Sequence, residues 1–549
     1  MRTLRILLIL AIFFALAPAD SVNLRVNQIG YLPGASKIGL AMSNDNLAGR
    51  TFTVVNANGA VVFSGTTGKD RGSYGSFAHV YELNFTSLGS PGRYRLDLGG
   101  SRSQTFTIGP DAYRSLVSLT LQFFRVQRCG NTNPLKHGPC HLKDGKTTDG
   151  RIIDASGGWH DAGDYLKFLI TTGGGLDLIL SSYHRHPQAF GDSDGDGVPD
   201  VLKEARIGLD WVKKLWDPSR SILYYQVGDE SDHEIWRMPE RDDARFPPRK
   251  VWPCLPGKGA NVAGKASAAF ALASVIWGDS SKPYHDAALA STYLTAAKQI
   301  YEFGKLRPVA QSSTSGFYEE SSWRDDLALA AAELYRATRE PKYLQDARRY
   351  AMASGIPYTF GYTELHGLAH YEIAKLDPSY KSIAAAKLTQ DLDAAVEYAG
   401  TNSFQAAVAP FYWGSNEAIM GAAIEAFLYQ DLTGNAKYNT LAATQIDFVL
   451  GANPWDFCWV GRAGSRWPHN PHHQIADLTH TELAGFWDEG PVARNIWRTQ
   501  GIRLRRPDSL AAFQSEAALY HDDVEDYVTN EPTISANSVG LALLSWLVP

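Results

Sequence analysis

The segment Gly109-Pro110-Asp111 divides the 549-residue sequence into two stretches whose apolar residues repeat with different periods. Before this segment, apolar and polar residues alternate, as in Arg93-Tyr94-Arg95-Leu96-Asp97-Leu98, which is the period of a half-buried β-strand. Asn56-Ala57-Asn58-Gly59 lies between two such runs and indicates a hairpin turn. Short strands at this spacing predict a small β-sandwich over residues 20–109.

After about residue 113 the apolar residues follow the period of an α-helix. Leu327, Ala330, Ala331 and Leu334, for example, fall on one helical face, and alanine at such positions lets helices approach closely. No alternation of strands with helices is visible, which argues against an α/β barrel. Residues 113–549 are therefore predicted to form a large all-α domain, whose topology the period does not determine. Two domains also suit the chain length.

The composition excludes some classes of partner. Lys and Arg number 52 against 58 Asp and Glu, for a net charge of −6, and no basic run occurs. We therefore expect no nucleic-acid partner, since a phosphate backbone requires positive charge. The 14 Trp and 26 Tyr fit either a packed core or stacking against sugar rings. Composition does not separate these two interpretations.

The first residues are typical of an export signal. Arg2 and Arg5 precede an apolar stretch from Ile6 to Ala17, and Ala17-Pro18-Ala19 has the small residues of a cleavage site. Residues 1–19 are therefore predicted to be a signal peptide, with a signal anchor as the alternative. We see no later apolar run of about 20 residues, so we expect a secreted monomer, extracellular or periplasmic, without a membrane partner once the signal is removed.

A glycine-rich turn carries the first candidate catalytic residues. Asp161 and Asp164 are three residues apart in Gly157-Gly158-Trp159-His160-Asp161-Ala162-Gly163-Asp164-Tyr165, so their carboxylates can point to the same side. Such a pair could hold a water molecule and remove its proton. An Asx turn or a cation-binding loop would have a similar sequence.

A second acidic segment, residues 520–533, contains the candidate acid. Most of its carboxylates could form a solvated face, but Glu531 precedes Pro532, which imposes an extended or turn conformation. A carboxyl fixed on a loop near Tyr527 is a candidate for an acid whose pKa is raised by partial desolvation. Two carboxylates opposite one carboxylic acid are the groups that hydrolyse a glycosidic bond.

These segments resemble the active-site motifs of glycoside hydrolase family nine, the endoglucanase family with an (α/α)6 barrel. The stretch from Leu24 to Pro33 resembles the start of the immunoglobulin-like domain that precedes the barrel in one branch, and residues 323–327 and 412–416 resemble further family segments. The resemblance implies an immunoglobulin-like β-sandwich at 20–109, an (α/α)6-barrel catalytic domain at 113–549, and inverting hydrolysis of β-1,4-glucosidic bonds in cellulose or related β-glucans.

The resemblance also implies roles for individual residues. Asp164 corresponds to the general base, Asp161 to a helper that holds the water, and Glu531 to the general acid. Because inversion leaves room for water, acid and base should lie about 6.5–9.5 Å apart. We expect four substrate-contacting side chains: Trp323, Trp413, His472 and Tyr527.

The sequence departs from the family at two positions near these residues. Gln474 stands where the histidine signature has arginine, so a neutral amide replaces a charged, forked donor. Ser535-Ala536 replaces the common Asp-Tyr after the acid. An exo-acting β-glucosidase or glucosaminidase therefore remains an alternative. A non-catalytic binding protein would need neither acid nor base, and a lyase would need a cluster of Arg and Tyr that we do not find.

Two groups of residues are candidate metal ligands. A calcium loop is predicted from alternating carboxylates, with Gly at the sharp turn; a solvated acidic turn is the alternative. Its expected ligands are Asp192, Asp194, Asp196, Asp200 and Glu204. Structural zinc is predicted from thiolates and imidazoles, and the family resemblance agrees, although export would favour a disulfide between the two cysteines. Its expected ligands are Cys129, Cys140, His141 and His160.

Overall fold

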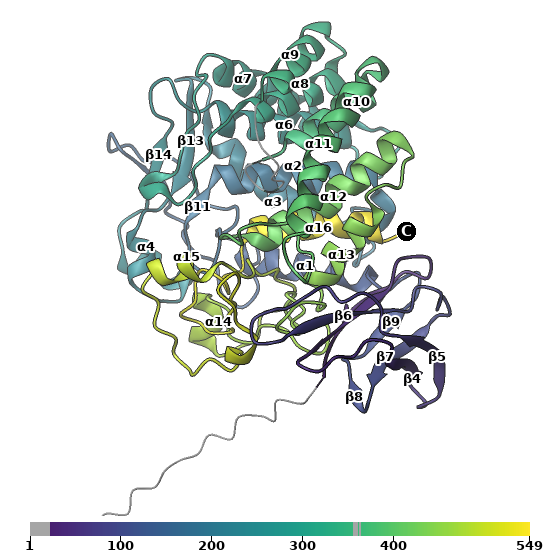
Figure 1. The fold of residues 1–549 in the computed structure, drawn as a ribbon. Coiled ribbons are helices and arrows are strands. Elements are labelled where there is room, and N and C mark those ends of the chain that lie inside the picture. Colours follow the sequence, from purple (N-terminus) through teal and green to yellow (C-terminus); the bar gives the residue numbers. More distant parts are fainter. Residues whose placement is uncertain (1–21, 355–360, 362–363) are drawn as a thin grey trace, which may run out of the picture.

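The structure, a computed structural model, describes residues 22–354, 361 and 364–549 (Figure 1). The predicted signal peptide lies outside these residues. A small domain of β-strands carries the N-terminal part of the chain, and a larger helical domain carries the rest. The change from strands to helices falls at the Gly109-Pro110-Asp111 segment, between β9 (Phe106–Ile108) and α1 (Arg114–Gln127).

The N-terminal domain contains two β-sheets with apolar residues between them. The first sheet has the order β1 (Asn23–Arg25), β3 (Ile38–Ser43), β6 (His79–Asn84). The second has the order β2 (Gly30–Tyr31), β9, β7 (Gly92–Leu98), β4 (Thr51–Asn56), β5 (Val61–Thr66), and β8 (Ser101–Arg102) pairs with β7. Alternating side chains such as Leu96 and Leu98 are buried, and the predicted turn at 56–59 joins β4 to β5. The predicted strands and hairpin are confirmed.

Six mostly buried helices of the larger domain form a closed ring among the described residues. They are α2 (Leu169–Arg185), α6 (Ala260–Gly278), α8 (Arg324–Thr338), α10 (His366–Leu376), α12 (Ser415–Thr433) and α16 (Ile534–Leu547). Each contacts the next in this order, and α16 returns to α2. Small residues make such packing possible, because a Cβ at Gly264 of α6 would overlap Asp326 of α8.

A second set of helices packs outside this ring, each against one or two of the ring helices. The set comprises α1, α3 (Asp200–Lys214), α7 (Ala287–Lys305), α9 (Pro341–Ala353), α11 (Lys381–Ala399) and α13 (Asn439–Val449). These helices bury one face and expose the other, which produces the helical period of the sequence. Short helices occur in the loops: α4 (Ser231–Glu234), α5 (Asp242–Arg245), α14 (Gln474–Thr479) and α15 (Arg494–Thr499).

The larger domain is not entirely helical, which corrects the all-α prediction. Its loops form a small sheet of β10 (Lys146–Thr147), β14 (Lys250–Pro253), β13 (Ile222–Val227) and β11 (Lys167–Phe168), with β12 (Trp216–Asp217) paired to β13. Most of these strands have two to four residues, too few for a two-residue period to be visible in the sequence.

Helix α6 is long and apolar enough to cross a membrane by length and composition alone. However, 94% of its most apolar window is buried inside the protein. The helix belongs to the ring and contacts α2, α7 and α8. Its apolar character is therefore explained by burial on all sides.

The two domains meet at the end of β1 and along the segment that follows it. The Arg25 guanidinium donates a hydrogen bond to the carbonyl of Pro454 at 2.8 Å, and the Asn27 amide donates to Asp447 at 3.0 Å. The backbone N–H of Gln28 donates to the carbonyl of Leu450 at 2.9 Å. These side chains are buried, so polar residues of the Leu24–Pro33 stretch join the sandwich to the helical domain.

Candidate active site

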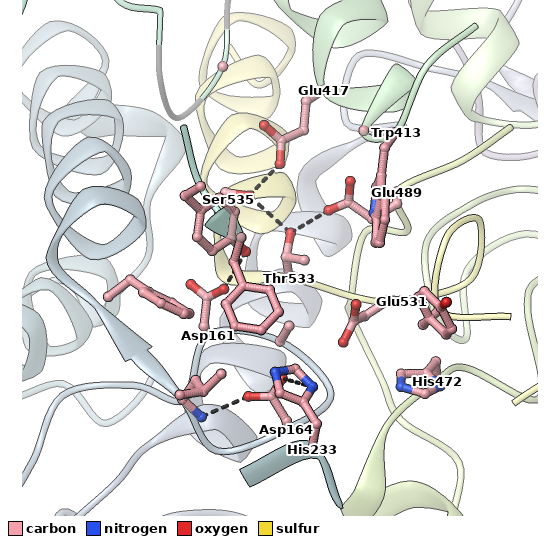
Figure 2. A pocket seen from close by; sticks show the side chains of 18 of the residues that line it. Asp161, Asp164, His233, Trp413, Glu417, His472, Glu489, Glu531, Thr533 and Ser535 are labelled. Atoms are coloured by element: carbon pink, nitrogen blue, oxygen red, sulfur yellow. Dashed lines mark hydrogen bonds and ion pairs between the residues drawn. The ribbon is translucent and has the colours of Figure 1, made fainter. Parts of the chain in front are cut away.

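A pocket of about 870 Å³ opens at one end of the helical ring, and Figure 2 shows the side chains around it. Its lining comes from segments far apart in the sequence. They are the turn 161–168, residues 233–236, 316–318 and 412–418, residues 361 and 364, the loops at 472–474, 489 and 500, and residues 527–535. The three predicted catalytic carboxyls line this pocket, as do three of the four predicted substrate contacts: Asp161, Asp164, Glu531, His472, Trp413 and Tyr527.

The turn that carries the aspartates is held by backbone hydrogen bonds to the C-terminal part of the chain. The N–H of Gln474 donates to the carbonyl of Gly163 at 2.8 Å. The N–H of Ile534 donates to the carbonyl of Asp161 at 2.9 Å. A side chain at position 163 would overlap the carbonyl oxygen of His472. Glycine is therefore required where the two loops touch.

Asp161 is buried and accepts hydrogen bonds from the hydroxyls of Thr171 and Tyr318. Its pKa is raised to about 7, chiefly by burial; the two hydrogen bonds oppose this rise, and the charge of Asp164 contributes to it. Asp164 accepts from the N–H of Leu166 at 2.7 Å, while its other oxygen lies 3.3 Å from Nδ1 of His233. Two carboxylates with different surroundings thus face the same space, as acid–base chemistry on a water molecule requires.

Glu531 lies across the pocket from the aspartates in Figure 2. Its Oε1 accepts one hydrogen bond, from the N–H of Gly163 at 3.1 Å. Burial raises its pKa well above the usual range, and the charge of Asp164 adds to this, with smaller contributions from Glu489 and Asp161. A carboxyl kept protonated in this way can donate a proton.

Aromatic rings line the outer part of the pocket. Trp413 is 43% exposed, which is unusual for so large an apolar ring, and it lies 5.8 Å from the ring of Tyr527. The ring of His472 lies close to two others, with its centroid 5.7 Å from that of Tyr527 and 5.1 Å from that of Trp236. Its Nδ1 donates to the carbonyl of Val524 at 2.6 Å, and burial lowers its pKa, so a neutral imidazole has Nε2 left for another partner.

Trp323, the fourth predicted substrate contact, lies outside the lining that the described residues form, and its contact with substrate stays a prediction. It precedes α8 and packs against Tyr350, with ring centroids 5.7 Å apart, and the Arg324 guanidinium lies over its ring. The sequence could not reveal this, because residues 323–327 place the tryptophan beside a helix start without giving its direction.

Several lining residues have no counterpart in the sequence prediction. His233 contacts Asp164 and stacks on Phe317, and Tyr318 donates to Asp161. Glu417 and Glu489 add carboxylates near the catalytic ones. All five lie in loops, in the single-turn helix α4 or at the start of α12, where periodicity carries no signal. Only the length of these loops and their content of Trp and His indicated a functional role.

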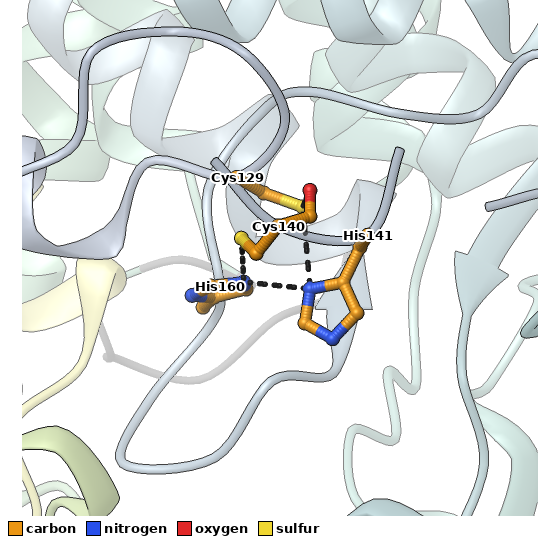
Figure 3. Close-up of side chains that lie close together, drawn as sticks. All are labelled: Cys129, Cys140, His141 and His160. Carbon is orange, nitrogen blue, oxygen red and sulfur yellow. Dashed lines mark hydrogen bonds between the residues drawn. The ribbon is translucent and has the colours of Figure 1, made fainter. Parts of the chain in front are cut away.

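The four predicted zinc ligands converge below the turn, and all are buried (Figure 3). Nδ1 of His141 lies 3.7 Å from Sγ of Cys129, Nε2 of His160 lies 3.7 Å from Sγ of Cys140, and the two nitrogens are 3.3 Å apart. A tetrahedral zinc ion with its usual bond lengths would separate sulfur from nitrogen by about 3.6 Å and the nitrogens by about 3.3 Å. The donor atoms therefore fit zinc, and both cysteines are free thiols.

A further contact orients one of these ligands. Nε2 of His141 lies 2.8 Å from a carboxylate oxygen of Asp242, so its Nδ1 faces the cluster. A carboxylate behind the outer nitrogen is the usual support of a metal-binding histidine.

In the structure, one of the five predicted calcium ligands lies outside the acidic loop. Glu204 does not face the loop: its carboxylate accepts from Arg128 and from the Trp159 indole. Helix α3 begins at Asp200, and successive helix residues are turned by about 100°, so Lys203 faces the loop while Glu204 faces the core. Glu204 as a calcium ligand is therefore wrong.

The lysine occupies the centre of the loop. Its Nζ lies 3.3 Å from Asp192, 2.9 Å from Asp196 and 3.7 Å from Asp200, and it also pairs with Asp194. Oxygens of three of these aspartates lie within 4.8 Å of one another. The oxygen donors suit calcium, but as they stand they surround an ammonium group instead.

Two carboxyl groups opposite a third whose pKa is raised, in a pocket with aromatic rings, are the arrangement typical of one class of protein, the glycoside hydrolases. A sequence profile of Glycosyl hydrolase family 9 matches residues 113–544, and a profile of the cellulase N-terminal Ig-like domain matches residues 19–103. The chain belongs to glycosyl hydrolase family 9, and its small domain is the Ig-like domain that precedes the helical one.

Known endoglucanases are similar to this chain. Endoglucanase C of Cellulomonas fimi is 26% identical over 96% of the chain, which spans 52% of that protein. The xyloglucan-specific endo-β-1,4-glucanase of Bacteroides ovatus is 25% identical over 96% of the chain and 94% of its own length. The crystal structure of a metagenome-derived family 9 endoglucanase superposes with a TM-score of 0.81, at 27% identity, covering 96% of this chain and 99% of that one.

The hydrogen bond from Tyr318 to Asp161 gives a testable pH dependence. It favours the ionised carboxylate and so lowers the pKa; in Tyr318→Phe the pKa of Asp161 should rise above its present value of about 7. The acidic limb of kcat/KM, which needs the ionised pair, should then move up by about half to one pH unit. Tyr350→Phe, outside the pocket, is the control. An unchanged acidic limb in Tyr318→Phe would contradict this role for the tyrosine.

Proposed function

We propose that this protein is a secreted, monomeric, inverting endoglucanase that hydrolyses β-1,4-glucosidic bonds in cellulose or related β-glucans. The proposal rests on one observation: Asp161 and Asp164 line the same pocket as Glu531, whose pKa is raised. The endoglucanase relatives support the substrate class. We also propose that the domain is an (α/α)6 barrel, since six ring helices each pack against an outer helix.

In the proposed reaction Glu531 donates its proton to the leaving glycosidic oxygen. Asp164, with Asp161 beside it, accepts a proton from the water that attacks the opposite face of the sugar, which inverts the anomeric carbon. The sugar would stack on Trp413 and Tyr527, and Nε2 of His472 would accept a hydrogen bond from a hydroxyl. Closely fitted aromatic faces exclude water and fix the ring at the two carboxyls.

Replacing the acid should affect substrates according to their leaving groups. Glu531→Gln should reduce kcat on cello-oligosaccharides about 10²–10⁴-fold, because the departing oxygen receives no proton. The kcat on a dinitrophenyl cellobioside should fall much less, because its leaving group needs no proton. Glu525→Gln, a partly exposed carboxyl of the same segment, is the matched control. Equal losses on both substrates would remove Glu531 as the acid, and an initial β anomer by NMR would rule out inversion.

We propose that Cys129, Cys140, His141 and His160 hold one structural zinc ion. The ion would supply a closed tetrahedral link below the catalytic turn and no open position for water. His160 directly precedes Asp161, so the link would fix the start of that turn.

Metal analysis of the purified protein should find about one zinc per chain. Cys140→Ser should lose the zinc and melt at a lower temperature, because a structural zinc ion contributes directly to folding. Cys254→Ser, a cysteine outside the cluster, should keep the metal. Peptide mapping that finds a Cys129–Cys140 bridge in a zinc-free native protein would overturn the assignment.

We further propose that Asp192, Asp194, Asp196 and Asp200 bind a structural calcium ion in competition with Lys203. Calcium should raise the melting temperature. At a hundredfold excess over Kd it should increase the free energy of unfolding by about 2.7 kcal/mol. Lys203→Ala should bind calcium more tightly, since the competing ammonium is gone. Melting curves of the unaltered protein and of Lys203→Ala, each with chelator and with calcium, test this. No calcium effect on either would show that the loop is only an acidic turn.

A further inference from the structure

A second buried group of metal-ligand side chains lies outside the pocket, between the ring and the outer layer of helices. It consists of His366 at the start of α10, Asp391 of α11 and Glu425 of α12. All three side chains are buried, and none of them belongs to the pocket lining formed by the described residues. The proposed hydrolysis therefore gives these residues no role.

Two of the three side chains carry buried atoms without a hydrogen-bond partner. Glu425 is fully buried, and neither of its carboxylate oxygens accepts a hydrogen bond. Nδ1 of His366 is also buried and unpartnered, while its Nε2 lies 2.7 Å from a carboxylate oxygen of Asp391. An unpaired polar group in the interior is costly, and an unpaired charge costs more. Lone pairs in this position are available to a cation.

The backbone of α10 leaves room for the glutamate. A Cβ at Gly367, the second residue of the helix, would lie 2.2 Å from Oε1 of Glu425. Any larger residue at this position would displace the carboxylate. Glycine is less favourable than alanine in a helix, so the helix gives up stability where the carboxylate lies.

The charges of the group balance only with a cation. Within the described part of the chain Asp391 pairs with His366, and neither Asp391 nor Glu425 forms an ion pair with a lysine or arginine. Burial raises the pKa of Glu425 to about 8, and the charge of Asp391 adds to this rise while that of His366 opposes it. A divalent cation would neutralise both carboxylates, with a neutral imidazole as the third ligand.

The donor atoms are spaced for one ion. One donor atom of each residue lies within 4.8 Å of the donor atoms of the other two. Ligands that bind one ion at about 2.0–2.2 Å lie at most about 4.4 Å apart, so the three atoms need only a small approach. The ion would replace the proton between His366 and Asp391 and move these side chains apart by about half an ångström.

We propose that His366, Asp391 and Glu425 bind one divalent transition-metal ion, zinc or manganese. One imidazole nitrogen with two carboxylates suits these metals, whereas calcium takes oxygen ligands alone. The ion would join two ring helices to an outer helix at the point where α10 begins. Glu364, two residues before His366, lines the pocket, so the ion would also steady that part of the pocket wall.

The test measures metal bound to the purified full chain after dialysis against zinc or manganese chloride and removal of free metal. The unaltered protein should hold about one ion per chain more than Glu425→Gln, because the amide lacks the charge that binds the ion. Asp391→Asn should show the same loss. Glu397→Gln, which removes one exposed carboxyl of α11, is the matched control and should bind as much metal as the unaltered protein.

Melting curves give a second readout, because an ion bound to the native state alone raises the melting temperature. Added zinc or manganese should raise it more in the unaltered protein than in Glu425→Gln, whose cooperative transition also shows that the variant folds. Neither readout depends on the proposed hydrolysis.

The cysteine cluster is separated from this site by a double variant. Glu425→Gln introduced into Cys140→Ser should again remove about one ion per chain. A loss that vanishes in this background would overturn the inference. Equal metal content and equal melting shifts in the unaltered protein, Glu425→Gln and Asp391→Asn would overturn it as well, and the group would then be a buried ion pair beside a protonated glutamate.

Discussion

The contact between the aspartate turn and the C-terminal segment is the constraint on which the active site depends. Gly163 donates its N–H to Glu531 and accepts from Gln474, while Asp161 accepts from the N–H of Ile534. These partners are more than 300 residues apart in the sequence. They meet because α16 packs against α2 and closes the helical ring. The proposed acid and base are therefore placed by the same closure that completes the core.

The cluster of cysteines and histidines supports this turn from the other side. His160 belongs to the cluster and is bonded by its backbone N–H to the carbonyl of Gln127, at the end of α1. The next residue, Asp161, is bonded to the segment that starts α16. The turn is thus fixed at both ends by rigid elements, which is how a loop can hold catalytic groups to the accuracy that proton transfer requires.

Local sequence patterns predicted turns and strands well. They failed where the role of a residue depends on the direction in which its side chain points. The hairpin at 56–59 and the turn at 157–165 depend on nearby residues, so the sequence contained them. Glu531 could be singled out because the residue that follows it, Pro532, restricts its backbone. Glu204 could not be placed, since one position along α3 turns a side chain from the acidic loop to the core. The burial of Glu489 beside Thr533 depends on ring closure, which no local period records.

The acidic lining and the strength of the general acid are physically linked. Glu489 is one of the charges that raise the pKa of Glu531, so the pocket without substrate keeps the acid protonated. Burial acts in the same direction, and the charges of Asp164 and Asp161 add to it. Only the hydrogen bond from the N–H of Gly163 favours the ionised form of Glu531. The proton affinity of this carboxyl is therefore set by the whole acidic lining rather than by one neighbour, because each nearby negative charge makes a further one less favourable.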